Sequence, residues 1–178
     1  MRISGRRSQA SQQRRFSRVP SMNPDQHATR SANVDDAHAI GHLLHDFNTE
    51  FGEPSPGAEV LEARLRMLLG GGRTLALVSG TPPIAVALVT LRPNVWYAGQ
   101  VALLDELYVV PERRGQGIGS ALITHLLSTA LALSVDLIEI NVDEGDVDAQ
   151  RFYQRHGFTA VAPDSPERAF YYWQDITF

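Results

Sequence analysis

The sequence predicts an α/β protein of the mixed α+β kind, with one mostly antiparallel sheet of about six to seven strands flanked by helices. Two strand-like segments, residues 73–79 and 84–92, are joined by a turn with two prolines, which is typical of a hairpin. A third strand, residues 101–110, runs through a glycine-rich turn into an apolar helix over residues 117–133. A strand at residues 137–142 follows, and an ordinary crossover makes it parallel to the third strand.

The amino-terminal half predicts a short strand and two helices before this sheet. Residues 28–31 are the strand, and Asn33 is placed to cap a helix that runs to about residue 48. Ser55 caps a second helix that has Pro56 at its first position and ends before three glycines near residue 70. The stripe expected to be buried on the first helix consists of Ile40, Leu43, Leu44 and Phe47.

The carboxy-terminal part predicts one more helix and the last two strands. The helix covers residues 146–156, and Gly157 ends it in a left-handed conformation. Residues 158–162 and 170–175 have the strand composition that completes the predicted sheet. A length of 178 residues fits a single domain with a sizeable core.

Composition excludes several classes of site. Cysteine is absent, so the chain has neither disulfides, nor thiolate metal sites, nor a cysteine nucleophile. No apolar run reaches membrane-spanning length, and we expect a cytoplasmic protein without membrane or nucleic-acid partners. All 16 basic residues are arginine; six of them and none of the 20 acids lie in residues 1–22. A basic leader, residues 1–25, therefore precedes an acidic domain, residues 26–178.

The leader allows more than one interpretation. Its arginine- and serine-rich, acid-poor composition is typical of a transit peptide, and it could also serve as a nucleic-acid-binding arm. We favour a disordered segment upstream of a start at Met22, because its apolar content is too low to form a core.

Three histidines, His38, His42 and His45, follow one another along the first helix. Histidines on one helix face can bind zinc, but no H-E-x-x-H arrangement accompanies them and they fall on the polar side. We therefore expect a solvated face and no metal.

The glycine-rich turn, residues 113–119 (R-R-G-Q-G-I-G), has the composition of a phosphate site. Glycines at alternate positions let a ligand approach the backbone, and the first amides of the next helix lack intrahelical acceptors. A Walker loop would need lysine after its last glycine, where Ser120 stands, and the G-x-G-x-G spacing does not match the dinucleotide-binding fingerprint.

Two stretches resemble motifs of the GNAT superfamily of N-acetyltransferases. Arg114, Gly117 and Gly119 fill the acetyl-CoA-binding signature [QR]-x-x-G-x-[GA] after the strand E-L-Y-V-V-P. Residues 149–158 (A-Q-R-F-Y-Q-R-H-G-F) resemble the late motif A-x-x-[FL]-Y-x-x-x-G-F. The resemblance covers roughly residues 27–178 and implies the GNAT fold, with a parallel strand pair at the acetyl-CoA cleft.

The resemblance also implies which residues bind the cofactor. The amides of Leu107 and Val109 would bind the pantetheine arm and the acetyl oxygen, and amides from residue 114 to residue 120 would hold the pyrophosphate. Asp146 stands where the family often has asparagine, which is a departure from the pattern. The full implied set is Leu107, Tyr108, Val109, Arg114, Gly115, Gln116, Gly117, Ile118, Gly119, Ser120, Asn141, Asp146 and Phe152.

The candidate catalytic residues are Tyr153, Glu106 and Asp105. The tyrosine of the late motif protonates the leaving thiolate in the family, and Tyr153 inherits that role. An amine acceptor is a cation at neutral pH, so a carboxylate must take its proton before attack. Strand side chains alternate, so we expect only one of the adjacent acids to face the acceptor and favour Glu106, while a bulge would bring in Asp105.

These inferences predict an acetyl-CoA-dependent N-acetyltransferase that acts on a primary amine by direct transfer in a ternary complex. The turn is most similar to the diamine and polyamine branch, so a polyamine-like or aminoglycoside-like small molecule ranks first as the acceptor. By resemblance, Glu50, Phe51 and Glu53 line the acceptor side. A protein lysine or amino terminus as acceptor, and a non-catalytic acyl-CoA sensor, are the alternatives; a homodimer is left open.

Overall fold

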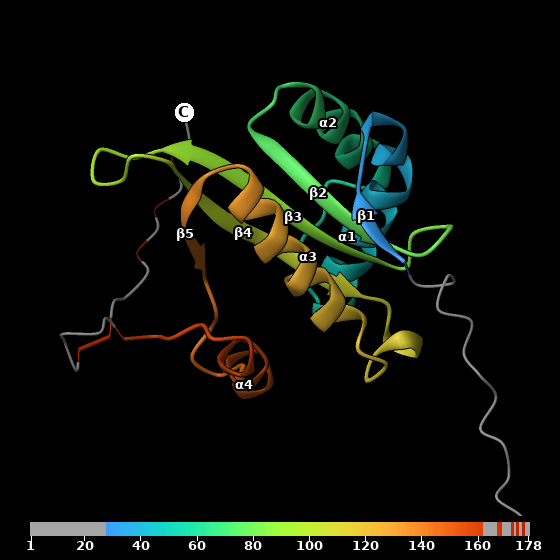
Figure 1. The fold of residues 1–178 in the computed structure, drawn as a ribbon. Helices are drawn as coiled ribbons and strands as arrows, with labels where there is room; N and C mark the ends of the chain where they lie inside the picture. The colour runs from blue at the N-terminus through green and yellow to red at the C-terminus, as the bar shows by residue number, and fades with distance from the viewer. Residues whose placement is uncertain (1–27, 162–166, 169–171, 173, 175, 177–178) are drawn as a thin grey trace, which may run out of the picture.

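The computed structural model describes residues 28–161, 167, 168, 172, 174 and 176, and it contains one mixed sheet (Figure 1). Strand order follows the sequence, and β1 to β4 are antiparallel neighbours. The last pair, β4 and β5, is parallel, which confirms the predicted crossover through α3. The strands are β1 (Thr29–Ser31), β2 (Thr74–Ser79), β3 (Ala85–Pro93), β4 (Gln100–Val109) and β5 (Val135–Ile140).

The described part of the chain has five strands, and the expectation of six to seven was wrong for this part. Residues 158–161 form no strand; Val161 makes only an isolated antiparallel bridge to Arg168. The Thr159 hydroxyl accepts from the Val161 amide at 3.3 Å and donates to its carbonyl at 3.1 Å. This local turn uses the main-chain groups that a ladder would need. The strand predicted at residues 170–175 lies mostly outside the described residues.

Helices lie on both faces of the sheet, as Figure 1 shows. The pair α1 (Ala37–Phe51) and α2 (Ala58–Gly70) covers one face, here called the α1/α2 face. The crossover helix α3 (Ile118–Ala132) covers the other, here called the α3 face, and α4 (Val147–Arg155) follows β5. No helix in the described part of the chain is long and apolar enough to cross a membrane.

Two helix starts differ from the prediction. Asn33 caps a short 3₁₀ helix, η2 (Val34–Asp36), and α1 begins only after it. The second helix, α2, begins at Ala58, two residues later than expected. Ser55 does not cap it: its hydroxyl lies 2.8 Å from His45 Nδ1 and accepts from the Gly57 amide.

The histidines of α1 have protein neighbours. His38 Nδ1 lies 2.7 Å from a Glu62 carboxylate oxygen of α2, and the His42 ring lies 4.7 Å from the His38 ring. His45 bonds to Ser55, as described above. Two of the three histidines therefore link α1 to the segment that follows it.

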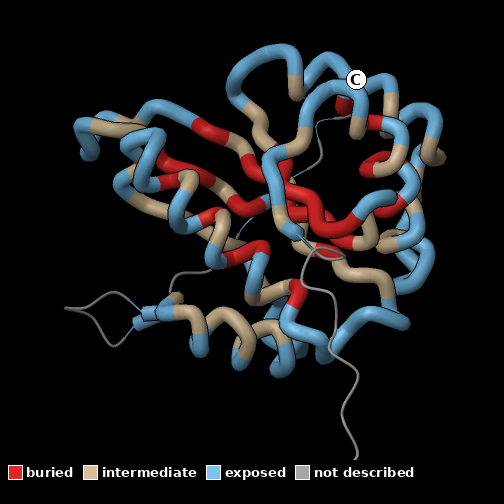
Figure 2. Tube along the Cα trace, turned by 45° about the vertical axis from the view of Figure 1, so that its right-hand side comes forward, coloured by how far each residue is buried: buried red, intermediate tan, exposed pale blue. Residues whose placement is uncertain are grey.

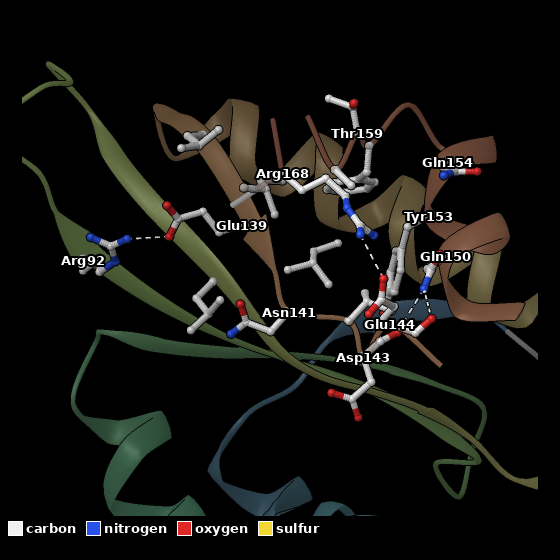
Figure 3. A pocket seen from close by; sticks show the side chains of 17 residues that line it. Arg92, Glu139, Asn141, Asp143, Glu144, Gln150, Tyr153, Gln154, Thr159 and Arg168 are labelled. Carbon is white, nitrogen blue, oxygen red and sulfur yellow. Dashed lines mark hydrogen bonds and ion pairs between the residues drawn. The ribbon is translucent and has the colours of Figure 1, made fainter. Parts of the chain in front are cut away.

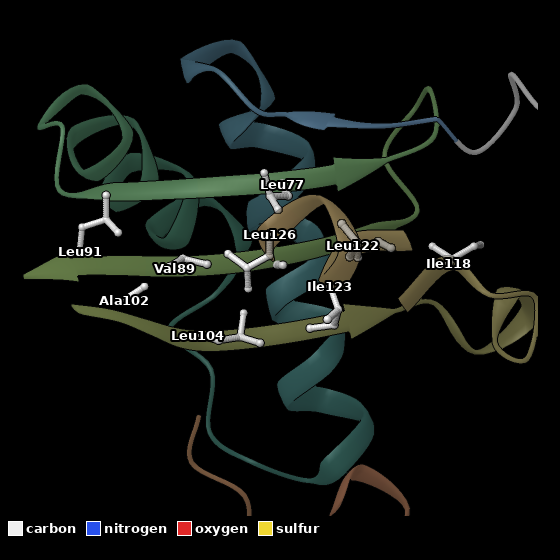
Figure 4. Close-up of a cluster of buried hydrophobic side chains, with 11 residues drawn as sticks. Leu77, Val89, Leu91, Ala102, Leu104, Ile118, Leu122, Ile123 and Leu126 are labelled. Atoms are coloured by element: carbon white, nitrogen blue, oxygen red, sulfur yellow. The ribbon is translucent and has the colours of Figure 1, made fainter. Parts of the chain in front are cut away.

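The core consists of two apolar clusters, one on each face of the sheet. On the α3 face, Leu122, Ile123 and Leu126 pack against strand residues such as Leu77 and Val89 (Figure 4). The buried stretches run through the strands and the inner sides of the helices, while the outer turns are exposed (Figure 2). Burial of each large aliphatic side chain contributes about 1.5–3 kcal/mol, so α3 is fixed firmly against the strands that it connects.

Candidate functional site

Among the described residues, one edge of β4 has no partner strand where β4 approaches the glycine turn. The parallel ladder with β5 ends at the pair Leu104 and Ile140, while β4 continues to Val109 beside β3 alone. The Val110 amide donates to the Ile84 carbonyl of the β3 side at 3.1 Å. Main-chain groups alternate along a strand, so those of Leu107 and Val109 face the unpaired edge. These two amides thus face an edge that has no strand partner in the described part of the chain.

Tyr108 does not fit the predicted cofactor set. Its main-chain groups face β3, by the same alternation, and its side chain is only 4% exposed. The ring packs 5.2 Å from the Phe47 ring in the core of the α1/α2 face. Neither part of Tyr108 reaches the unpaired edge, so this residue supports the core beneath the site.

The glycine turn presents a run of amides with no protein acceptor. Gly115 and Gly117 have φ of +72° and +82°, values that strain other residues, and open space surrounds both. The first bond that closes α3 runs from the Ala121 amide to the Gly117 carbonyl. Among the described residues, the amides from Gly115 to Ser120 donate to no protein atom. Such a concave run at a helix start fits a phosphate or diphosphate.

Arg114 faces away from this run, contrary to the prediction. Its amide already donates to the Pro111 carbonyl at 3.2 Å. Its guanidinium donates to both oxygens of Glu50 at 2.7 Å and to the Val109 carbonyl at 2.9 Å. The group also lies 5.6 Å from the centre of the Tyr108 ring. Arg114 therefore joins the end of β4 to the last turn of α1, and the run of amides without a protein acceptor begins at Gly115.

Glu50 is consequently an ion-paired side chain and not a free carboxylate for the acceptor. The hydrogen bond from Arg114 holds its pKa below the usual carboxyl range. The neighbouring Phe51 is 59% exposed and packs edge-on against Phe47 at 5.3 Å. Glu53 is exposed just beyond, where its amide donates to the Asn48 carbonyl. Phe51 and Glu53 remain accessible candidates at this end of α1.

A β-bulge brings Asp105 and Glu106 to the same face. In the ladder with β3, Glu106 stands opposite Leu88 and Leu104 opposite Val89, so Asp105 is the extra residue. Leu88 packs with the cluster on the α1/α2 face, which gives Glu106 the same orientation. The Thr90 hydroxyl, two residues along β3, donates to Asp105 at 2.7 Å. Strand alternation would have sent the two acids to opposite faces, and the ladder shows instead the bulge that was expected as the alternative.

Helix α4 brings Tyr153 beside β5, where its ring packs against the core of the α3 face. Asp146 caps this helix, since its carboxylate accepts from the Ala149 amide at 2.9 Å, which leaves it less free for a cofactor. Phe152 packs against the start of α3: a β-carbon on Gly119 would lie 3.3 Å from its ring. Tyr153 is half-buried, and within the described part of the chain its hydroxyl bonds to no protein group.

Burial and neighbouring charges shift the pKa values of Glu106, Asp105 and Tyr153. Burial raises the pKa of Glu106, and the charge of Asp105 adds to this shift. Burial also raises the pKa of Asp105, against the opposing hydrogen bond from Thr90. Burial, followed by the charges of Asp146 and Glu106, raises the pKa of Tyr153 to about 12. The phenol therefore stays protonated at physiological pH, and Glu106 lies within its electrostatic reach.

A cavity of about 890 Å³ opens beside β5 and α4 (Figure 3). Tyr153 and Asn141 both line it, whereas Glu106 and the glycine turn do not. Ion pairs stand at two places in its wall, one between Arg92 and Glu139 and the other between Arg168 and Glu144 (Figure 3). The cavity thus gives the Tyr153 side of the site an open approach.

One residue next to the predicted site, His156, escaped the sequence reasoning, whereas its partner Ser120 belongs to the predicted cofactor-binding set. The Ser120 hydroxyl lies 3.0 Å from Nε2 of His156, which joins the start of α3 to the end of α4. His156 stands inside the late motif, one position before Gly157, and a histidine at the end of a motif helix was the signal that could have found it.

The mixed sheet, with helices on both faces and a parallel pair at its end, is a fold of the acyl-transferase type. The run of amides, Glu106 and Tyr153 form its candidate site. The sequence matches the acetyltransferase (GNAT) family over residues 38–158, which is more than half of its 178 residues. The chain therefore belongs to the acetyltransferase (GNAT) family.

Three similar proteins are consistent with this membership. A crystal structure of a protein from Arthrobacter sp. FB24, assigned to the acetyltransferases, is 46% identical with a TM-score of 0.79, covering 84% of this chain and 96% of that one. The peptidyl-lysine N-acetyltransferase YjaB of Salmonella typhimurium is 40% identical over 55 residues, which is 31% of this chain and 34% of that protein. The aminoalkylphosphonate N-acetyltransferase of Salmonella typhimurium is 28% identical over 93 residues, 52% of this chain and 54% of that protein. The chain thus spans about a third to a half of these curated relatives.

Proposed function

We propose that this protein is an acetyl-CoA-dependent N-acetyltransferase that acetylates the primary amine of a small molecule by direct transfer. The observation that carries the proposal is the run of six acceptor-free amides beside the unpaired edge of β4. The run suits the diphosphate, and the edge suits the amide-bearing pantetheine arm as an added strand-like partner. The reactive end of such a donor would lie in the gap between Glu106 and Tyr153.

In the proposed reaction Glu106 and Tyr153 carry out the proton transfers. Acetyl-CoA supplies the acetyl thioester. Glu106, directly or through water, takes a proton from the acceptor ammonium, and the amine nitrogen then forms a bond to the thioester carbon. The carbon–sulfur bond breaks, and the Tyr153 hydroxyl gives its proton to the departing sulfur. Because the Tyr153 hydroxyl makes no hydrogen bond to the described part of the chain, its proton is available for this step. The acylated nitrogen then loses its second proton to the Tyr153 phenolate, directly or through water, which leaves the neutral amide and restores the phenol.

The small-molecule acceptor is supported by the charge of the site and by one relative. Asp105 and Glu106 face the same side without a basic partner among the described residues, which favours a cationic amine. The aminoalkylphosphonate acetyltransferase is named for a small amine. The match to a peptidyl-lysine acetyltransferase makes a protein lysine the second candidate.

The function is tested with an assay for released thiol, using acetyl-CoA and a panel of polyamines, aminoglycosides, aminoalkylphosphonates and lysine peptides. We expect turnover with at least one small amine. Turnover of peptides alone would replace the first acceptor class by the second. Binding of CoA without turnover of any amine would indicate the acyl-CoA sensor, and absence of CoA binding would reject the proposal.

The pH dependence of kcat/KM tests the assignment of the base. Glu106 must be ionised to accept a proton, so kcat/KM should fall as the pH drops through a pKa that lies above the ordinary carboxyl value. Asp105→Asn removes a neighbouring negative charge, which lowers this pKa and moves the acidic limb to lower pH. Glu106→Gln should abolish the limb and reduce kcat/KM by about 100-fold.

Initial rates across the pH range, at fixed ionic strength, measure this dependence. Glu59→Gln, an exposed carboxylate on α2, is the matched control and should leave the profile unchanged. An acidic limb that persists in Glu106→Gln would show that another group is the base.

A further inference from the structure

Two helices that are far apart in sequence meet at the proposed diphosphate site. Ser120, the third residue of α3, contributes one of the acceptor-free amides. Its hydroxyl lies 3.0 Å from Nε2 of His156, at the carboxyl end of α4, and this contact is partly buried. We propose that His156 is a positioning residue that orients the Ser120 hydroxyl toward the diphosphate, an inference that rests on the proposed function. The same contact links the diphosphate site to the helix that carries Tyr153.

The hydrogen-bonding capacity of the two side chains supports the orienting role. A hydroxyl has one proton to donate and two lone pairs, and a neutral imidazole has one donor and one acceptor nitrogen. When Nε2 of His156 carries the proton, it donates to the Ser120 oxygen. The hydroxyl proton of Ser120 is then free to donate to a phosphate oxygen beside the open amides. An anion at the turn favours this arrangement, because it supplies the acceptor that the hydroxyl proton needs.

The packing around His156 fixes its ring in this position. The ring lies 4.8 Å from the Phe152 ring, which in turn fills the space beside Gly119 on α3. A β-carbon at Gly119 would lie 3.3 Å from the Phe152 ring, so Phe152 would have to shift by a few tenths of an ångström to admit a side chain there. The hydrogen bond between Ser120 and His156 therefore lies beside the apolar contact of Phe152 with the start of α3.

The same end of α4 determines where Tyr153 stands. The carbonyl of Tyr153 accepts from the amides of His156 at 2.9 Å and Phe158 at 3.2 Å. The Phe158 ring packs at 5.8 Å from the Tyr153 ring. Anchoring His156 to α3 therefore holds the helix turn that carries the phenol, and donor binding at the turn is linked to the position of the acid.

A comparison of two acyl donors distinguishes a role of His156 at the diphosphate from a general effect on folding. Acetyl-CoA carries the diphosphate, whereas S-acetylpantetheine carries the same thioester arm without it. We expect His156→Ala and Ser120→Ala each to raise KM for acetyl-CoA by about 10-fold, the range of one charge-assisted hydrogen bond. KM for S-acetylpantetheine should change by less than about 2-fold, and kcat with acetyl-CoA should fall only slightly.

A double-mutant cycle and two controls complete the experiment. The double variant should bind acetyl-CoA no more weakly than either single variant, because both lose the same interaction. His156→Gln should restore most of the affinity, since its amide can donate from a position near that of Nε2. Ser128→Ala removes a hydroxyl that donates only to the Thr124 carbonyl of the same helix, and it should leave both donors unaffected.

Failure of the His156 proposal can be distinguished from failure of the proposed function. If the unaltered protein binds no CoA in isothermal titration calorimetry, the proposed function and this inference both fail. If it binds CoA but His156→Ala leaves the affinity unchanged, only the role of His156 is rejected. Equal losses with both donors, or additive losses in the double variant, would also reject it.

Discussion

Gly117→Asp is expected to weaken acetyl-CoA binding by about 100-fold or more, because a carboxylate a few ångströms from a diphosphate costs several kcal/mol at an effective dielectric constant near 20. Gly117 is the residue before α3, and open space surrounds it, so the new side chain would stand within the run of free amides. A negative charge at the start of a helix also favours the helix itself. Affinity should therefore fall without loss of the fold, as calorimetric titration and a thermal melt would show.

Two control variants isolate the charge at this position. Gly117→Asn has nearly the same size and the same left-handed backbone strain at φ of +82°, but no charge, and it should lose far less affinity than the aspartate. Gly72→Asp introduces the same residue at another left-handed glycine, in the turn before β2, and should leave CoA binding unaltered. Equal losses for Asp and Asn at position 117 would indicate that backbone strain, not repulsion of an anion, disrupts the turn.

Tyr153→Phe is expected to lower kcat by about 100-fold, within the usual range for loss of a general acid, while KM for acetyl-CoA stays nearly constant. The hydroxyl makes no hydrogen bond to the described part of the protein, so its removal leaves no orphaned partner. The ring contacts with Phe152 and Phe158 persist in the phenylalanine variant. The melting temperature should therefore change little, which separates a chemical effect from a structural one.

Single-turnover rates and CoA titration together measure this effect. Tyr97→Phe, in the connection between β3 and β4 and 41% exposed, is the matched control and should leave kcat unchanged. A Tyr153→Phe protein with full turnover would show that another group, or water, protonates the departing sulfur. A variant that loses CoA affinity and turnover in equal measure would indicate a binding role for the hydroxyl.

Local sequence patterns predicted much of the observed fold. Alternation and turn residues located β2, β3 and β4, and the glycine-rich turn followed by an apolar run located the start of α3. The parallel pair of β4 and β5 followed from the length of the crossover between them. Of the two further strands expected, the one at residues 170–175 lies mostly outside the described residues. At residues 158–161 the Thr159 side chain bonds to the Val161 main chain, an outcome that strand composition does not reveal.

By itself the sequence determined the candidate anion-binding turn and the candidate phenol. Both depend on residues close together in the chain: glycines that free the amides, and a tyrosine on the inner side of a short helix. Only the tertiary structure decided that Asp105 and Glu106 share a face, that Arg114 turns to Glu50, and that His156 reaches Ser120. The last two contacts join residues 64 and 36 positions apart, and the bulge depends on the register with β3. Contacts of this range are set by how the elements pack, which no local pattern of residues encodes.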